Sequence, residues 1–395
     1  MIKKTLSLLL VFLMLVNNID IGANTTSIET NTEPVGLNIS AKAFVLMEAS
    51  TGTVIASNNE NERLSPASIT KLMTLLLIFE DLSSGKIKLD DVVTTSEYAR
   101  SMTGSKVFLE TGETQTVDTM IKCIAVASGN DASVAMAEFL SGTEAEFVKR
   151  MNEKAVSLGL DNTHFVDCCG LSDSDEHYMS AADVAKLARE LTTKYPNIFN
   201  YTKIWMENIT HVTKKGSKEF CLSSTNKLLK QYEWATGLKT GSTSKAKYCL
   251  AATATKEDVD MIAVVMAADN YKIRFTDAAK LLDYGFNNCS VYKDDDYGKL
   301  SEVKIIGGEK EYISGYVKDN FSYLSTDGSN LDSITKKYNY EDEIKAPIEK
   351  DDVIGYVEYY KNDEVIGEVE ILANENVDKA GFKYTFMKVL KKILL

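Results

Sequence analysis

The chain has 395 residues, of which 44% are hydrophobic and 26% charged, so it is long enough for two or three packed domains and is not disordered by composition. Its formal net charge of −13 argues against a nucleic-acid partner, which needs a clustered cationic surface. Only three histidines occur, and no two have a metal-ligand spacing, which disfavours a zinc hydrolase and weakens the case for a serine enzyme with a histidine base. We therefore expect neither a metal nor another cofactor.

The first 23 residues have the pattern of a secretory signal peptide. Lys3 and Lys4 precede an apolar run from Leu6 to Val16, and the small pair Gly22-Ala23 follows. The apolar run is short for a membrane span, although an uncleaved anchor is the alternative. Either interpretation places the rest of the chain outside the cytosol. The six cysteines, which include the neighbours Cys168-Cys169, form no regular disulfide framework, so we expect mostly free thiols.

Two short strands are predicted from Ala43 to Glu48 and from Thr53 to Asn58, around a turn that ends at Gly52. A Leu-rich run from Leu72 to Leu82 then predicts a buried helix, with Ser68 and Lys71 at its head. Residues three apart lie on one face of a helix, so this hydroxyl and this amine are expected side by side. A nucleophilic serine needs an adjacent base, and a lysine serves if burial or a second cation lowers its pKa. Ser-x-x-Lys alone is nevertheless a common pattern.

A polar segment that we interpret as irregular extends to Thr116. Three helices follow, from Val117 to Val126, from Asp131 to Leu140 with Asp131 as its cap, and from about Thr143 to Leu158. The polar turn Ser128-Gly129-Asn130 separates the first two of them.

From Tyr201 the pattern changes to alternating, strand-like runs. After Leu238-Lys239-Thr240-Gly241, two β-rich runs from Tyr248 to Thr255 and from Val259 to Met266 indicate an antiparallel hairpin, and a helix from about Phe275 to Gly285 closes the region. Strands at both ends that enclose helices predict an α+β domain in which N-terminal and C-terminal strands share one sheet.

Beyond Cys289, short alternating runs with charged turns predict a small all-β domain, which we interpret as a spacer or an interaction module. These runs are Val303 to Ile306, Tyr312 to Val317, Val353 to Tyr360 and Val365 to Leu372.

The last segment, Val377 to Leu395, predicts a cationic amphipathic helix. Six apolar side chains gather on one face and three lysines on the other, a pattern that suits the surface of an anionic membrane. The apolar residues are Phe382, Phe386, Val389, Leu390, Ile393 and Leu394, and the lysines are Lys388, Lys391 and Lys392. Docking of this helix on its own β domain is the alternative.

Three motifs thus occur in one order, on a helix start, an inter-helix turn and a strand. They are Ser68-x-x-Lys71, Ser128-Gly129-Asn130 and Lys239-Thr240-Gly241. This combination resembles the penicillin-recognising serine enzymes, whose motifs are Ser-x-x-Lys, Ser-x-Asn and Lys-Thr-Gly. Longer stretches are similar to the low-molecular-mass penicillin-binding proteins that act as D-Ala-D-Ala carboxypeptidases. They are residues 66–74, 127–132 and 237–243, with Asn162-Thr163-His164-Phe165 followed by Gly170-Leu171.

The resemblance implies a penicillin-binding, β-lactamase-like α+β domain at about residues 36–286, with an antiparallel sheet, flanking helices and a helical subdomain. A small β domain at 290–374 and an amphipathic helix at 377–395 would follow, as in that family. It also implies peptidoglycan stem peptides as substrates, β-lactam antibiotics as inhibitors, and a peripheral location on the outer face of the cytoplasmic membrane, facing the cell wall.

The resemblance also implies roles for individual residues. Ser68 would attack the carbonyl of the penultimate D-Ala, and Lys71, as a neutral amine, would take its proton. The charge of Lys239 would help to lower the pKa of Lys71. Ser128 would pass the proton to the departing D-Ala, and Asn130 would bind the substrate amide.

The strand motif would supply the remaining contacts with the substrate. Backbone N–H groups of Ser68 and Ser242 would form the oxyanion hole, next to Thr240 and Gly241. A free terminal carboxylate is best bound by arginine, and Arg274, at the family's position, is our candidate together with Thr240. Cys168-Cys169 stands where relatives usually have other small or polar residues, so the loop beside the cleft can differ. Ser242 stands at a position where relatives vary, so the outer contacts with the substrate can differ.

Two other functions compete with this interpretation. A β-lactamase shares the three motifs, but it usually carries Ser-Asp-Asn and a Glu-bearing loop, whereas the middle motif here is Ser128-Gly129-Asn130. A non-catalytic envelope protein that binds peptidoglycan without turnover is the second alternative. The acyl-enzyme lifetime separates the first from a carboxypeptidase, and release of D-alanine separates the second.

Overall fold

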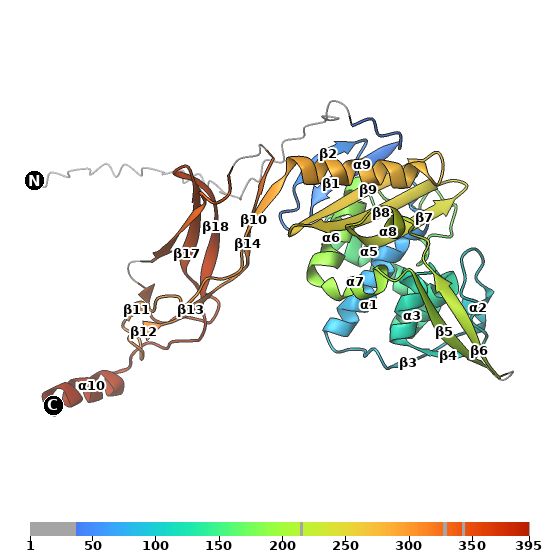
Figure 1. Cartoon of the computed structure of the whole chain (residues 1–395). Helices are drawn as coiled ribbons and strands as arrows, with labels where there is room; N and C mark the ends of the chain where they lie inside the picture. The colour runs from blue at the N-terminus through green and yellow to red at the C-terminus, as the bar shows by residue number, and fades with distance from the viewer. Residues whose placement is uncertain (1–36, 214–215, 327–329, 342–343, 395) are drawn as a thin grey trace, which may run out of the picture. The chain divides into compact units, whose positions relative to one another are not determined.

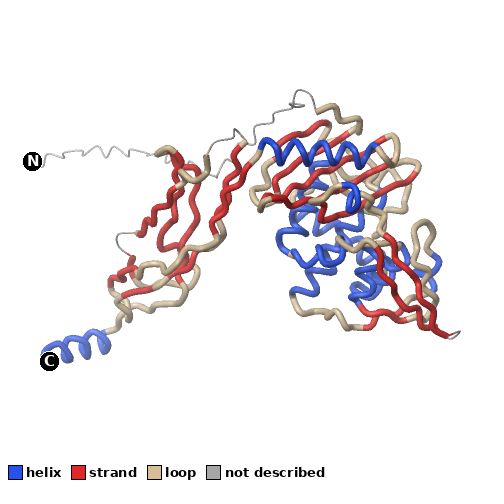
Figure 2. Tube along the Cα trace, in the orientation of Figure 1, coloured by secondary structure: helices blue, strands red, loops and turns tan. Residues whose placement is uncertain are grey.

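The computed structural model describes residues 37–213, 216–326, 330–341 and 344–394, so the predicted signal peptide, residues 1–23, lies outside the described residues. Helices and strands are mixed from Ala43 to Asn288, whereas the regular elements described between Ser290 and Ala373 are strands (Figures 1 and 2). The predicted α+β domain followed by a small all-β domain is therefore confirmed.

One five-stranded antiparallel sheet organises the first domain, with strand order β2-β1-β9-β8-β7. The strands are β1 (Ala43–Glu48), β2 (Val54–Asn58), β7 (Ala235–Thr243), β8 (Lys247–Lys256) and β9 (Val259–Ala268). The N-terminal hairpin pairs with β9, so strands from both ends of the domain share the sheet, as predicted.

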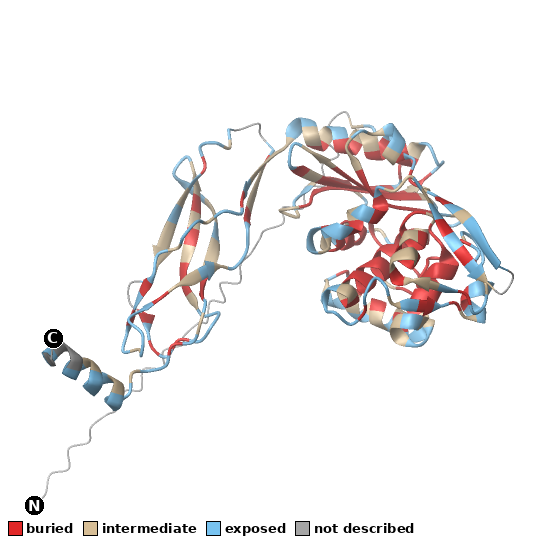
Figure 3. Cartoon of the chain, turned by 60° about the horizontal axis from the view of Figure 1, so that its bottom comes forward, coloured by how far each residue is buried: buried red, intermediate tan, exposed pale blue. Residues whose placement is uncertain are grey.

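Both faces of this sheet are covered, which explains why all six residues of β1 are buried. Phe44 and Leu46 face one apolar core, which they share with α9 (Ile273–Asn288). Val45 and Met47 point to the opposite core, which contains the helices of the remaining domain. This alternation follows the two-residue period of a strand. Figure 3 shows the buried residues concentrated between the sheet and the helices.

The other helices lie on the face of the sheet opposite α9 (Figure 1). They are η1 (Ala67–Thr70), α1 (Lys71–Ser83), α2 (Glu97–Ser101), α3 (Val117–Ala125), α4 (Asn130–Ser141), α5 (Glu144–Ser157), α6 (Ala181–Lys194), η2 (Pro196–Ile198) and α7 (Phe199–Thr202). The one-turn helix α8 (Leu228–Gln231) precedes β7. Two hairpins complete the domain, β3 (Val92–Thr94) with β4 (Thr114–Thr116) and β5 (Met206–Thr213) with β6 (Gly216–Ser223).

Two sequence interpretations are corrected by this arrangement. The segment before Thr116 is not wholly irregular, because it contains α2, β3 and β4, which are too short to show a periodic pattern. Asp131 does not cap α4, which begins one residue earlier with Gly129 as its N-cap. The Asp131 carboxylate instead accepts hydrogen bonds from the backbone N–H groups of Val107 and Leu109.

The second domain has a core of its own, in which the rings of Phe321 and Tyr359 stack at 3.6 Å between centroids. Its strands are β10 (Ser290–Asp294), β11 (Val303–Ile306), β12 (Tyr312–Ile313), β13 (Gly315–Val317), β14 (Phe321–Ser325), β15 (Thr335–Tyr340), β16 (Ile344–Lys345), β17 (Val353–Lys361) and β18 (Glu364–Ala373). The largest of its sheets has the order β13-β18-β17-β15.

The structure describes a final helix α10 (Phe382–Leu394), which begins five residues after the predicted start at Val377, because Val377 packs in the core of the β domain and pairs with Ile348. Large apolar side chains of this helix are exposed, including Phe382 at 86%, Phe386 and Ile393. In the part of the chain that the structure describes, no helix combines the length and the hydrophobicity that membrane crossing requires.

Candidate active site

Ser68 and Lys71 meet at the start of α1, as their spacing predicts. Ser68 lies in η1, a one-turn 3₁₀ helix, rather than in the α-helix, and Lys71 is the first residue of α1. The Lys71 Nζ atom lies 2.9 Å from the Ser68 Oγ atom. The residue before Ser68, Ala67, has a left-handed backbone with φ of 46°, which an alanine adopts only where the surroundings impose it.

Lys71 is fully buried, and its amine has two further partners. Nζ lies 2.7 Å from Asn130 Oδ1 and 2.7 Å from the carbonyl oxygen of Cys169. Burial disfavours the ammonium form and lowers the pKa of Lys71, although Cys169, Cys168, Asp167 and Asp131 act in the opposite direction. Lys71, the candidate base, therefore lies within hydrogen-bond distance of Ser68, the candidate nucleophile, in surroundings that favour the neutral amine.

A second hydroxyl–amine pair stands beside the first. The Lys239 Nζ atom, on β7, donates to Ser128 Oγ at 2.8 Å and to the Thr240 carbonyl oxygen at 3.1 Å. Burial lowers the pKa of Lys239 well below its usual value, and the charges of Lys71 and Arg274 lower it further. Burial and the charge of Lys239 were the two predicted causes of a lowered Lys71 pKa. Burial is the main cause, as one part of that prediction states, whereas the effect between the two amines falls on Lys239.

Asn130 connects the middle motif to the loop that precedes it. Its Oδ1 atom faces Lys71, while its Nδ2 atom donates to the Thr103 carbonyl oxygen at 2.6 Å. Its backbone N–H donates to the Ser105 carbonyl oxygen at 2.8 Å. The amide of Asn130 is therefore fixed in orientation, with the oxygen toward the amine and the nitrogen toward the loop.

β7 packs directly on η1, and glycine makes this approach possible. A Cβ atom on Gly241 would lie 2.6 Å from the Pro66 carbonyl oxygen, so the strand could not pass as close with any other residue. Thr240 is buried, and its Oγ1 atom lies 2.6 Å from Thr225 Oγ1. Ser242 is exposed at the outer end of the motif.

Arg274, in the first turn of α9, lies behind the strand motif. Its Nη1 atom donates to the carbonyl oxygens of Gly241 at 3.1 Å and of Cys249 at 3.4 Å, and its guanidinium lies over the ring of Phe275. Its buried Nε atom has no hydrogen-bond partner among the described residues. The guanidinium thus reaches the backbone one residue from Thr240.

The loop at Cys168-Cys169, which the sequence placed beside the cleft, supplies the Cys169 carbonyl oxygen, but its contact with Lys71 was not predicted. The Asp167 carboxylate accepts hydrogen bonds from the backbone N–H groups of Cys169, Gly170 and Ser172, and so closes the loop beneath Lys71. A Cβ atom on Gly170, where φ is +78°, would lie 1.8 Å from the Ala67 carbonyl oxygen. A contact through a backbone carbonyl leaves no pattern in the sequence. The occurrence of Asp167 three residues before Gly170 nevertheless indicates a loop.

The histidine nearest the motif belongs to the support of the site. His177 Nδ1 accepts a hydrogen bond from the Val166 backbone N–H, so its Nε2–H donates to Thr70 Oγ1 at 2.8 Å. Burial lowers the pKa of His177 and favours this neutral ring. The six cysteines form no disulfide, and four of them, Cys123, Cys168, Cys169 and Cys249, are buried, which agrees with the expectation of free thiols.

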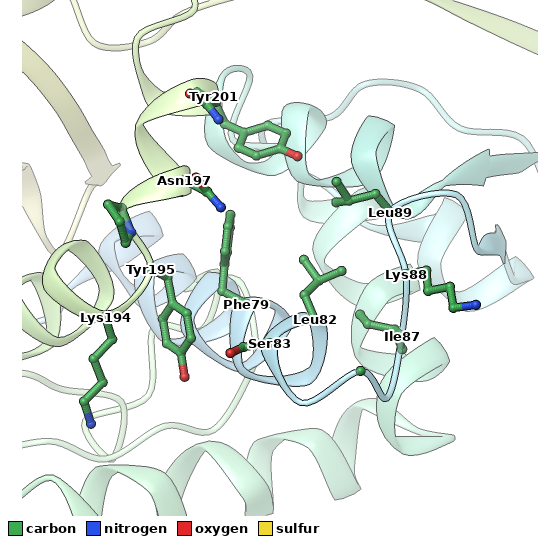
Figure 4. Close-up of a pocket in the computed structure, with 13 residues that line it drawn as sticks. Phe79, Leu82, Ser83, Ile87, Lys88, Leu89, Lys194, Tyr195, Asn197 and Tyr201 are labelled. Carbon is green, nitrogen blue, oxygen red and sulfur yellow. The ribbon is translucent and has the colours of Figure 1, made fainter. Parts of the chain in front are cut away.

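A separate cavity of about 580 Å³ opens at the other end of α1. Figure 4 shows Phe79, Leu82, Tyr195 and Tyr201 among its walls, and none of the motif residues lines it. With a rise of about 1.5 Å per residue, Phe79 lies roughly 12 Å along the helix from Lys71. This cavity is therefore not part of the site that the motifs build.

Comparisons with known proteins agree with this geometry. Residues 27–270 match the family model described as D-alanyl-D-alanine carboxypeptidase, and residues 286–379 match that of the C-terminal domain of penicillin-binding protein 5. The chain is 44% identical over 351 residues to D-alanyl-D-alanine carboxypeptidase DacF of Bacillus subtilis, with 88% of both chains covered.

More distant relatives show the same similarity over most of the chain. The chain is 32% identical to D-alanyl-D-alanine carboxypeptidase DacC of Escherichia coli, over 87% of this chain and 86% of that protein. The crystal structure of penicillin-binding protein 5 from Haemophilus influenzae matches with a TM-score of 0.71 at 30% identity, covering 88% of this chain and 99% of that one. The chain therefore belongs to the D-alanyl-D-alanine carboxypeptidase family of low-molecular-mass penicillin-binding proteins, serine peptidases of peptidoglycan metabolism that β-lactams inhibit.

Proposed function

We propose that this carboxypeptidase uses Ser68 as its nucleophile and Lys71 as the base, and that it works at the outer surface of the cytoplasmic membrane. The observation that carries the catalytic part is the 2.9 Å approach of a fully buried lysine, with a lowered pKa, to the Ser68 hydroxyl. A nucleophile and a base within hydrogen-bond reach are what acyl transfer from a serine requires.

The three contacts of Lys71 suit a neutral amine. A neutral amine has two N–H groups and one lone pair, and the two carbonyl oxygens of Asn130 and Cys169 accept from the N–H groups. The lone pair is then directed to the Ser68 hydroxyl, from which it takes the proton as Oγ attacks the carbonyl of the penultimate D-Ala. The backbone N–H groups of Ser68 and Ser242 would stabilise the oxyanion.

The second pair would serve the leaving group. When the peptide bond breaks, the departing D-Ala nitrogen needs a proton. Ser128, which is hydrogen-bonded to Lys239, would donate it and would regain a proton from the ammonium of Lys71, which received it from Ser68. Asn130 would hold the substrate amide, and Arg274 with Thr240 would bind the free terminal carboxylate beside Gly241. Water then hydrolyses the ester on Ser68 and releases the shortened peptide.

Mass spectrometry of the purified protein after brief exposure to penicillin tests the nucleophile. The parent should carry one acyl group on the peptide that contains Ser68, and Ser68→Ala should carry none while it remains folded. An acyl-enzyme that turns over within seconds would favour a β-lactamase. If the parent released no D-alanine from a pentapeptide that ends in D-Ala-D-Ala, the non-catalytic alternative would be favoured.

The membrane part of the proposal rests on α10. Its exposed apolar side chains have no role in the peptidase domain, and a basic amphipathic helix binds in the interface of an anionic bilayer without crossing it. Residues 1–23 would direct the chain across the cytoplasmic membrane, so that the domain faces the cell wall.

Vesicle sedimentation tests this anchoring. Deleting residues 382–395 should move the protein, lacking residues 1–23, from anionic vesicles to the supernatant while hydrolysis of a soluble peptide continues. Replacing Phe382 and Phe386 with serine is the finer variant, because it keeps the lysines and removes apolar area. Sedimentation of the deletion variant at the level of the parent would show that the attachment lies elsewhere.

A further inference from the structure

A cavity of about 500 Å³ lies between the loop that connects α2 to β4 and the hairpin formed by β5 and β6. Its walls combine the rings of Phe108 and Phe220 with polar groups that include His211, Lys218 and Glu110. Figure 1 shows the β5–β6 hairpin beside β4, on the side of the domain that carries α2 and α3. This mixture of aromatic walls with a few polar groups is typical of a small-ligand site.

His211 contributes an unsatisfied hydrogen-bonding atom to this cavity. Its side chain is 11% exposed, and its Nδ1 atom lies 2.7 Å from the Oε1 atom of the buried Glu113. Glu113 also accepts from the Glu110 backbone N–H and from Gln115 Nε2, so its carboxylate is an acceptor throughout and Nδ1 carries the proton. In the neutral ring the Nε2 atom offers a lone pair, and it has no partner among the described residues. An occupant that satisfies Nε2 must therefore bring a hydroxyl or an N–H group.

Phe108 is held with its ring toward solvent. The side chain is 63% exposed, and its backbone is left-handed with φ of 63°, which is rare for a bulky residue. The N–H groups of its neighbours, Val107 and Leu109, both donate to the Asp131 carboxylate, which fixes this conformation. An aromatic ring that the fold exposes by means of a strained backbone is a candidate for contact with a ligand.

The cavity is tied to the active site by a short stretch of chain. The carbonyl oxygens of Thr103 and Ser105 bind Asn130, which contacts Lys71, and Phe108 follows only three residues later. Three residues span at most about 11 Å, so a substrate that extends beyond its two terminal alanines can reach both places.

We propose that this cavity binds an amino sugar of the glycan strand to which the stem peptide is attached. A pyranose has an apolar C–H face that packs on an aromatic ring, and Phe108 presents such a ring. Its hydroxyl and acetamido N–H groups are donors of the kind that His211 Nε2 lacks, and Lys218 at the rim can donate to the acetamido carbonyl oxygen. This inference rests on the proposed function, because it extends the peptide substrate to its glycan carrier.

The test compares two substrates of the full-length protein lacking residues 1–23. One is the free pentapeptide ending in D-Ala-D-Ala, and the other is the same pentapeptide on a disaccharide of N-acetylglucosamine and N-acetylmuramic acid. Phe108→Asn removes the ring and keeps a residue that tolerates a left-handed backbone. We expect it to lower the ratio of kcat/KM for the glycosylated substrate to that for the free peptide by about tenfold, or about 1.4 kcal/mol. Phe139→Leu, at a partly exposed phenylalanine outside the cavity, is the control and should leave the ratio unchanged.

The glycan site would be overturned if Phe108→Asn kept the parent's ratio of kcat/KM for the glycosylated substrate to kcat/KM for the free peptide. That result includes the case in which both kcat/KM values fall by the same factor. Failure of the proposed function has a different signature, because the parent itself would then release no D-alanine from the free pentapeptide.

Side-chain NMR gives a reading that does not depend on turnover. With only three histidines in the chain, the peptide-free disaccharide should shift the Nε2 resonance of His211 and leave those of His164 and His177 in place. No shift at His211, at disaccharide concentrations that change the kinetics, would also overturn the site.

Discussion

Replacement of Gly170 by alanine tests whether the loop beneath Lys71 positions the catalytic pair. The Cβ atom would lie 1.8 Å from the Ala67 carbonyl oxygen, and ordinary contact begins at 3.4 Å, so the loop and the turn that carries Ser68 must move apart. Because Gly170 follows the residue whose carbonyl oxygen binds Lys71, the displacement reaches the amine directly. A misplacement of about 1 Å in a catalytic pair costs on the order of 100-fold in rate.

The control for this variant is Gly112→Ala. Gly112 has the same φ of +78° as Gly170, but a Cβ atom there would meet nothing within 4 Å. Both variants should therefore lose about 1–2 kcal/mol of unfolding free energy through the left-handed backbone, and only Gly170→Ala bears the additional clash. Urea unfolding measures the first effect, and the rate of acylation by labelled penicillin measures the second.

We expect acylation to fall by about 100-fold in Gly170→Ala and by less than twofold in Gly112→Ala. Equal acylation rates in the two folded variants would refute the reasoning, because the loop could then move without disturbing Lys71.

Three further predictions concern charged groups. The acylation rate should rise with pH as Lys71 loses its proton, and the midpoint of the rise should lie below 10.5, the ordinary pKa of a lysine. A pH series with labelled penicillin measures it, and a midpoint at or above 10.5 would contradict the assignment of Lys71 as a neutral base. Asp167→Asn should lose about 2 kcal/mol of unfolding free energy at pH 7. Burial raises the pKa of Asp167, but His177 and the backbone N–H groups lower it by more, so its net shift is downward. The loss of unfolding free energy should therefore shrink as the pH falls below about 4, and a loss that is constant with pH would show that the charge of Asp167 is not its cause. Arg150→Lys should cost about 1–2 kcal/mol in the same assay, because Arg150 binds both oxygens of the buried Asp81 and lysine cannot; no change would show the pair to be inert.

Regular elements and motifs were largely predictable from the sequence because their signals are periodic or made of side chains. The boundaries of β1 agree with the prediction, and the strands that became β8 and β9 were placed to within a few residues. α6 (Ala181–Lys194) was overlooked, although Ser180 caps it and apolar residues recur along one face, so the signal was present.

Other features of the site were beyond the reach of sequence patterns. The carbonyl oxygen of Cys169, the left-handed backbone of Ala67 and the burial of Lys71 arise from tertiary contacts between segments about 100 residues apart. Burial and a neighbouring cation were both predicted as causes of a lowered Lys71 pKa, but only the folded chain shows that burial is the larger cause and that the effect between the amines falls on Lys239.

The two buried lysines are best understood by what each of them touches. Lys71 contacts the Ser68 hydroxyl and two carbonyl oxygens, whereas Lys239 contacts the Ser128 hydroxyl and one carbonyl oxygen. Two ammonium ions in one site without water repel each other, so the pKa of at least one amine is lower than in water, and that amine loses its proton more readily. If Lys71 is the neutral one, it takes the proton from Ser68 in one hydroxyl–amine pair, and this proton then passes to Ser128 in the other pair as Ser128 protonates the departing D-Ala. Such a division requires both pairs to be intact, and it explains why the chain retains two costly buried amines where a single base would suffice for acylation alone.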